Sequence, residues 1–163
     1  DQDVEAIFGP KGAIEAFIWA KQNGLTRYIG VTGHHDPEIL RKCLSMFDFD
    51  TVLMPVNPAE PSHDSFLDIV LPDALEKDMG IICMKVYFRG LAQKIPWFES
   101  MSPFYRFALS QPVSTAVIGC DNIRHIEENV QIASNFEPMT PEDMKELVAA
   151  VRPFARNLMY YKP

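Results

Sequence analysis

The sequence has 163 residues, of which 47% are hydrophobic and 23% are charged, and its net charge is −7. This length and composition are those of a globular chain that can bury one substantial core. The acidic balance argues against a nucleic-acid partner, and no apolar run approaches the ~20 residues that a membrane-spanning helix needs.

The start of the chain and its cysteines indicate the cellular compartment. Residues 1–5, DQDVE, have none of the features of a signal peptide, and the three cysteines are far apart and odd in number. We therefore expect Cys43, Cys83 and Cys120 to be reduced, buried residues of a cytoplasmic protein rather than a disulfide framework. Cys120 also precedes a predicted helix, a position that suits a thiolate nucleophile.

The first predicted unit is a helix followed by a strand. Apolar residues at helical spacing predict a helix over residues 11–23, and Gly24 stands where a left-handed residue commonly follows a helix. A strand is predicted over residues 27–31. Asp36 is the expected N-cap of the next helix, which runs to about Met46. Between that strand and helix lies the polar run Thr32, Gly33, His34 and His35.

The same strand-then-helix unit is repeated twice in the middle of the chain. A strand over residues 51–56 is followed by a helix over residues 65–77. A strand over residues 81–86 is followed by a long loop and then by a helix over residues 104–109. Loops as long as residues 87–101 usually carry function or insertions.

Residues 113–129 are the most informative stretch. Residues 113–118 are predicted to be a short buried strand that Gly119 ends, and Asp121 or Asn122 can cap a helix over residues 123–133. Because free backbone N–H groups point out of a helix N-terminus, this turn suits a phosphate. A structural turn that binds nothing fits the same spacing.

The whole pattern predicts a parallel α/β fold. Thr140 caps a last helix over residues 141–154, and residues 156–163 are expected to be irregular. One helix, four strand–helix units and a closing helix form a single domain over residues 1–163. Four parallel strands fit half of an eight-stranded TIM barrel or a flavodoxin-like open sheet. In both architectures the site lies at the carboxyl ends of the strands.

Four strand-end motifs resemble the C-terminal half of the aldo-keto reductase family, in the right order and over nearly the whole chain. The segment GLTRYIGVTGH (residues 24–34) is similar to the family's fifth strand, FDTVLMPVN (49–57) to its sixth, and GIICMK (80–85) to its seventh. The segment IGCDNIRHIEEN (118–129) resembles the cofactor signature after the eighth strand.

The resemblance implies a (β/α)₈ barrel whose full form moves hydride between NADP (or NAD) and a carbonyl or alcohol. The family's Asp, Tyr, Lys and His tetrad lies on its first four strands, so we expect this chain to lack the tetrad and to have little or no reductase activity alone. A non-catalytic nucleotide-binding or assembly module is the alternative. Lys85 at a strand end also allows a Schiff-base lyase.

The resemblance also assigns candidate site residues, and no metal site is expected from the histidines. His34, Asn57 and Trp97 are expected in a substrate pocket, and Glu60 is expected to be an exposed loop carboxylate. Asp121 would repel a 2′-phosphate and favour NAD unless Arg124 compensates. The expected contacts of the dinucleotide are Thr32, Gly33, Met84, Lys85, Gly119, Cys120, Asp121, His125, Glu128 and Asn129.

Half of a barrel leaves two unpaired parallel strand edges and an open inner core. We therefore expect pairing with a second copy, as a homodimer, or with an N-terminal half on another chain. The small-molecule partners implied are a nicotinamide dinucleotide and, in the full barrel, a small carbonyl substrate.

Overall fold

The computed structural model describes residues 2–163. Its four parallel strands form one sheet in the order in which they occur in the sequence. This order is that of a barrel segment, whereas a flavodoxin-like sheet reverses its order at a switch point. The predicted half barrel is therefore confirmed, and the flavodoxin-like strand order of the alternative is wrong. The strands are β1 (Gly30–Thr32), β2 (Thr51–Pro55), β3 (Gly80–Met84) and β4 (Thr115–Ala116).

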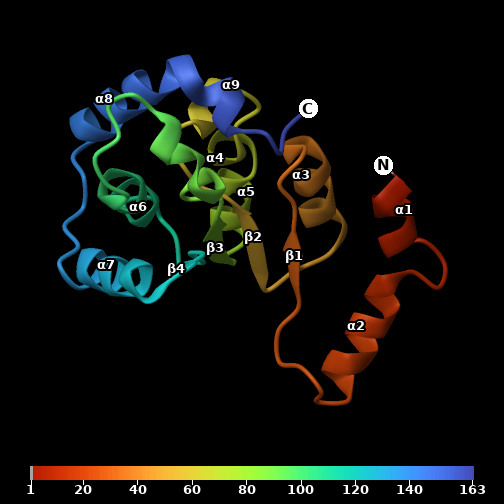
Figure 1. Cartoon of the computed structure of the whole chain (residues 1–163). Helices are drawn as coiled ribbons and strands as arrows, with labels where there is room; N and C mark the ends of the chain where they lie inside the picture. The colour runs from red at the N-terminus through yellow and green to blue at the C-terminus, as the bar shows by residue number, and fades with distance from the viewer. Residues whose placement is uncertain (1) are drawn as a thin grey trace.

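The sheet is not closed within the described residues. β1 pairs with β2 and β4 pairs with β3, so each of these two strands has one edge without a partner strand in residues 2–163. Figure 1 shows the helices around the sheet, with α8 and α9 at one end and α2 beyond β1. The helices are α1 (Gln2–Phe8), α2 (Ala13–Gln22), α3 (Pro37–Met46), α4 (Phe66–Ile69), α5 (Leu71–Glu76), α6 (Ser102–Leu109), α7 (Ile123–Ser134), α8 (Pro141–Val151) and α9 (Ala155–Leu158).

Several helix starts follow the predicted capping chemistry. The carboxylate of Asp36 accepts hydrogen bonds from the Glu38 and Ile39 N–H groups at 2.8 and 3.3 Å, at the start of α3. Thr140 and Asp143 form a reciprocal capping box at the start of α8. Of the two candidate caps for α7, the structure uses Asn122, whose side chain accepts from the His125 N–H.

Other elements differ from prediction for physical reasons. The expected helix over residues 65–77 is two helices that meet at Val70, because Pro72 has no N–H to continue the first one. β4 is short and partly exposed rather than buried, and the side chain after it, Val117, is 59% exposed. No strand in the described part of the chain covers that side of β4. α1 was not predicted.

Two hydrophobic clusters hold the elements together. The larger one lies between the sheet and helices α3 to α5, with Val52, Met54, Phe66, Val70 and Cys83 fully buried. The smaller one lies between the loop after β3, α6 and the last helices. Its members are Ala59, Phe88, Ala92, Ile95, Phe104, Val151, Ala155, Leu158, Met159 and Tyr161. No helix of residues 2–163 has both the length and the apolar content required to cross a membrane.

The predicted irregular tail over residues 156–163 is confirmed only for residues 159–163, because α9 occupies the start of that range. Residues Ala155–Leu158 form α9, and Tyr161 and Lys162 are buried at 6% and 8% exposure. In Figure 1 the chain leaves α9 and crosses toward the end of β1 where α3 begins. This segment therefore lies over the carboxyl ends of the first two strands.

Asp50 ties α2 to the start of the sheet. Its carboxylate accepts hydrogen bonds at 2.7 Å from both the Lys21 ammonium and the Ile29 N–H. The pKa of Asp50 is lowered below its ordinary value of 3.8. The hydrogen bond from Lys21 is the largest cause, and the bond from the Ile29 N–H is the second. Because the pKa of Asp50 is lower in the folded state, its ionised carboxylate stabilises the fold at pH values above the ordinary pKa. This stabilisation is lost as the pH falls through the folded-state pKa.

We expect Asp50→Asn to lower the melting temperature at pH 7 by about 1–3 °C and to flatten the acid limb of the stability profile. The measurement is thermal unfolding followed by circular dichroism between about pH 2 and pH 7. This interval contains the pKa values of ordinary carboxyl groups. Asp48→Asn is the control, because Asp48 pairs with Lys77 but its side chain is 98% exposed. If both variants show the same dependence of melting temperature on pH, Asp50 does not have the stabilising role described above.

Candidate functional site

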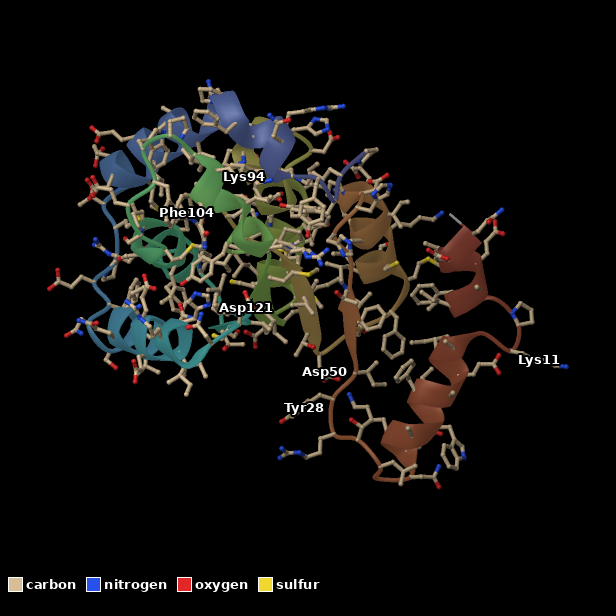
Figure 2. All side chains as sticks on the ribbon, in the orientation of Figure 1. Lys11, Tyr28, Asp50, Lys94, Phe104 and Asp121 are labelled. Carbon is tan, nitrogen blue, oxygen red and sulfur yellow. The ribbon has the colours of Figure 1, made fainter. Side chains whose placement is uncertain are left out.

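A cavity of about 560 Å³ lies at the carboxyl ends of β3 and β4. One wall is the long loop after β3, and the other is the turn that leads into α7. In Figure 2, Phe104 and Asp121 lie on this side of the molecule, whereas Lys11 and Tyr28 lie on the side of α1 and α2. Six of the residues predicted to contact a dinucleotide line the cavity: Lys85, Gly119, Asp121, His125, Glu128 and Asn129.

Four other predicted contacts do not line this cavity. Thr32 donates its hydroxyl proton to the Leu53 carbonyl at 3.1 Å, so it is engaged with the neighbouring strand. Gly33 packs against Leu40, which a Cβ at Gly33 would meet at 3.4 Å. Met84 is half-buried at the end of β3. Cys120 is exposed, contrary to the expected buried cysteine, and lies next to the cavity residue Asn129.

The three residues predicted for a substrate pocket also lie outside the cavity. The exposed His34 ring lies 6.0 Å from the ring of Tyr161. Asn57 is fully buried beneath the end of the chain. Trp97 stacks on Phe104 with 6.3 Å between ring centroids. The structure thus does not bring these three side chains to the cavity.

The loop after β3 has an unusual backbone. Lys85, Phe88 and Arg89 have φ values of 57°, 53° and 54°, and Gly90 has a φ of 83°. The left-handed region is costly for residues with a Cβ, and such positions gather at functional sites. Phe88, fully buried against Phe104 at 5.8 Å, anchors the loop in the smaller cluster. The turn thereby places both Lys85 and Arg89 on the cavity wall.

The two cations of this wall are held by aromatic rings. The Lys85 ammonium lies 5.8 Å from the ring centroid of Tyr160 and 5.7 Å from that of Tyr161. The Arg89 guanidinium carbon lies 5.7 Å from the Tyr160 ring. Ring faces attract cations without neutralising them. Within residues 2–163 neither cation forms a salt bridge, so both positive charges remain available to an anion.

The opposite wall combines a helix N-terminus with carboxylates. The Asn122 side chain accepts from the His125 N–H at 3.1 Å, and His125 Nδ1 accepts from the Asp121 N–H at 3.3 Å. The first N–H groups of α7 and the helix dipole favour an anion here. Asp121 and Glu128 also line the cavity, whereas Arg124 does not. The cavity thus has two cations and the carboxylate of Glu99 on the loop wall, and the carboxylates of Asp121 and Glu128 near α7.

Tyr87 connects the two walls and was not among the residues predicted for the site. Its hydroxyl donates to Asn129 Oδ1 at 2.6 Å, and Asn129 Nδ2 lies 3.2 Å from Cys120 Sγ. Burial, reinforced by Tyr105 and Glu128, raises the pKa of Tyr87, so the hydroxyl stays protonated and donating. The signal in the sequence was the position of Tyr87, directly after the strand predicted over residues 81–86.

Glu60 is buried, and the prediction of an exposed loop carboxylate is wrong. It is fully inaccessible to solvent and pairs with Lys162 at 2.7 Å. Burial raises the pKa of Glu60, although the Lys162 ammonium, the Phe66 N–H and the Tyr161 hydroxyl act in the opposite direction. Residues 2–163 contain no group of three or more His, Cys, Asp or Glu side chains that could hold a metal ion.

An unclosed parallel sheet with its cavity at the carboxyl ends of the strands defines a partial (β/α) barrel. No protein-family model and no curated protein sequence matches the chain. Among solved structures, the aldo-keto reductase AKR11C1 from Bacillus halodurans matches with a TM-score of 0.68 at 18% identity in its holo form. Its apo form gives a TM-score of 0.67 at 19% identity.

The match covers 84% of this chain but only 54% of the holo and 55% of the apo reductase chain. This chain therefore has the fold of part of an aldo-keto reductase barrel and spans about half the length of the reductase structures. The fold implied by the four strand-end motifs is confirmed.

Proposed function

We propose that the chain is the cofactor-binding part of an aldo-keto-reductase-like oxidoreductase and binds a nicotinamide dinucleotide in the cavity between β3 and α7. One observation carries this proposal. Six residues assigned to the dinucleotide from sequence motifs, which lie on two separate segments, converge on one cavity at the expected ends of the strands. The likeness of the fold to an aldo-keto reductase supports the choice of ligand.

The charges of the cavity suggest how the ligand lies. Lys85 and Arg89 offer two cations to the pyrophosphate, and charge-assisted hydrogen bonds of this kind are the stronger ones. Glu128 and Asn129, farther along α7, meet the adenosine. Tyr87 orients Asn129 through its 2.6 Å hydrogen bond.

The bound nicotinamide supplies hydride to a carbonyl carbon in such enzymes. The residues of this chain bind and orient the dinucleotide, and none of its tyrosines stands at the position of the family's acid. We expect NADPH oxidation with a reactive aldehyde to be slow or absent with this chain alone. Turnover comparable to that of a full-length reductase would contradict this proposal.

The acidic side chain at α7 favours NAD over NADP. Asp121 lines the cavity, whereas Arg124, the residue that would compensate its charge, does not. We expect the Asp121 carboxylate to face the 2′-phosphate of a bound NADP. Like charges repel, and the repulsion is strongest in a partly buried site.

We expect NAD⁺ to bind more tightly than NADP⁺, and Asp121→Asn to improve NADP⁺ binding about three- to tenfold with little change for NAD⁺. Titration followed by the fluorescence of Trp19 and Trp97 measures both affinities. Glu127→Gln, an exposed residue of α7 that does not line the cavity, is the control. If the chain binds neither NAD⁺ nor NADP⁺, the proposed function is overturned.

We also propose that a further four-stranded unit covers the two open edges, supplied by a second copy, another chain or a longer form of the same polypeptide. α7 has no buried residue, although Ile123, Ile126 and Val130 form an apolar face at helical spacing, with exposures of 73%, 52% and 58%. At the other edge, Trp19 and Tyr28 are 58% and 62% exposed. Apolar patches of this kind mark interaction surfaces.

The mass of the chain in solution tests this proposal. Sedimentation of the purified chain is expected to show a dimer or larger assembly, and Ile126→Asp is expected to shift it toward monomer because it places a charge on the apolar face. Glu127→Lys, on the adjacent polar position, is the control. A stable, folded monomer at all concentrations would refute pairing between copies.

A further inference from the structure

The end of the chain is fixed to the loop after β2 by a buried ion pair. The Lys162 ammonium donates to Glu60 Oε2 at 2.7 Å and to the carbonyls of His63 and Asp64, each at 2.8 Å. The Lys162 side chain is 1% exposed and that of Glu60 is 0% exposed. All three ammonium protons thus have partners, so Lys162 is held in one place. We call Tyr160, Tyr161 and Lys162 the clasp.

Tyr161 extends the clasp toward the cavity. Its hydroxyl donates to Glu60 Oε1 at 2.8 Å and accepts from Asn57 Nδ2 at 3.0 Å. Its carbonyl lies 3.0 Å from His35 Nδ1. Burial raises the pKa of Tyr161 above its ordinary value. The hydroxyl group therefore keeps the proton that it donates to Glu60.

Asn57 continues the network to the backbone of Lys85. The same Nδ2 group that binds Tyr161 also donates to the Lys85 carbonyl at 3.3 Å, while Asn57 Oδ1 accepts from the Ala59 N–H at 3.0 Å. Lys85 has a φ of 57°, a conformation that a residue with a Cβ keeps only when its surroundings hold it there.

The clasp also contacts the side chain of Lys85. The rings of Tyr160 and Tyr161 lie within 6 Å of the ammonium, at 5.8 and 5.7 Å, and Tyr160 shares its ring with Arg89. The same three consecutive residues therefore hold the main chain of Lys85 through Asn57 and its charge through two aromatic faces.

We propose that Tyr160, Tyr161 and Lys162 are positioning residues that hold Lys85 on the cavity wall in the orientation in which its ammonium group meets the anionic part of a bound ligand. The identity of the ligand rests on the proposed function. The restraint on Lys85 rests only on the contacts described above, so the two claims are tested separately.

The first experiment needs no ligand and follows amide hydrogen exchange in the turn after Lys85. The Phe88 N–H donates to the Lys85 carbonyl at 3.0 Å and the Gly90 N–H donates to the Tyr87 carbonyl at 2.7 Å. We expect Tyr161→Phe and Lys162→Met to accelerate exchange at both amides at least tenfold. Lys77→Met, which removes an ion pair with Asp48 at the opposite end of the sheet, is the matched control.

Unchanged exchange at Phe88 and Gly90 in a folded Tyr161→Phe variant would overturn the proposal. This variant keeps the ring and loses only the hydroxyl that joins Asn57 to Glu60, so it serves even where Lys162→Met does not fold. Tyr160→Leu, at a position that is 43% exposed, separately removes the ring shared by Lys85 and Arg89.

The second experiment is a double-mutant cycle with NAD⁺ as the probe. We expect Tyr161→Phe to weaken NAD⁺ binding about three- to tenfold, and to have no effect in a Lys85→Met background, because the clasp acts through Lys85. The same loss in both backgrounds indicates a general structural role and overturns the proposal. If the unmodified chain binds no NAD⁺, the proposed function fails, and the exchange experiment alone decides the role of the clasp.

Discussion

Replacing Lys162 with methionine is expected to lower the free energy of unfolding by about 3–5 kcal/mol. The substitution leaves the Glu60 carboxylate fully buried without its cation. Urea denaturation at pH 7 measures the loss. Because burial already raises the pKa of Glu60, the loss should shrink as the pH falls and the carboxyl group becomes protonated in the folded state.

A second substitution, at Glu60, distinguishes two causes of the lost stability: the unpaired charge and the lost packing of the Lys162 side chain. Lys162→Met combined with Glu60→Gln removes both charges and is expected to be more stable at pH 7 than Lys162→Met alone. Lys77→Met, in an exposed pair with Asp48, is expected to change stability by less than about 1 kcal/mol. A Lys162→Met variant as stable as the unmodified chain would show that the buried pair does not hold the end of the chain.

Replacing Phe104 with alanine is expected to cost about 3–5 kcal/mol and also to weaken nucleotide binding. Phe104 is fully buried and contacts the rings of three residues of the loop after β3. The centroid distances are 5.8 Å to Phe88 and 6.3 Å to both Trp97 and Phe98. Because this loop is one wall of the cavity, the lost support is expected to affect both stability and binding.

Phe49→Ala is the matched control for this variant. Phe49 is 8% exposed and packs against Phe8 and Phe47 in the larger cluster, beside α1. We expect a similar loss of stability from Phe49→Ala, measured by urea denaturation, but an unchanged affinity for NAD⁺. Equal losses of affinity would show that Phe104 acts through global stability rather than through the cavity wall.

Local chemistry made much of the fold predictable. The caps at Asp36 and Thr140 and the left-handed Gly24, with a φ of 71°, depend on residues a few positions apart. The location of the cavity was predictable as well, because the carboxyl ends of parallel strands meet at one end of a sheet. The short β4 was predicted as a buried strand because its apolar residues were expected to have neighbours on both faces.

Long-range polar contacts were not predictable in this way. Glu60 and Lys162 lie 102 positions apart, and no periodicity relates them. A loop carboxylate and a lysine near the end of a chain are ordinarily exposed, so their burial depends on the packing of the smaller cluster beside them, which contains their chain neighbours Ala59 and Tyr161. The same reason explains why Asn57 was assigned to a substrate pocket, although it lies beneath Tyr161.

The separation of Glu60 and Lys162 has a kinetic consequence. Joining such distant positions requires closure of a long loop, and contacts of this kind ordinarily follow the local helices and adjacent strand pairs during folding. The ion pair is then absent from the transition state, so its loss accelerates unfolding while leaving the refolding rate nearly unchanged. The end of the chain thus governs the lifetime of the native state more than the speed of reaching it.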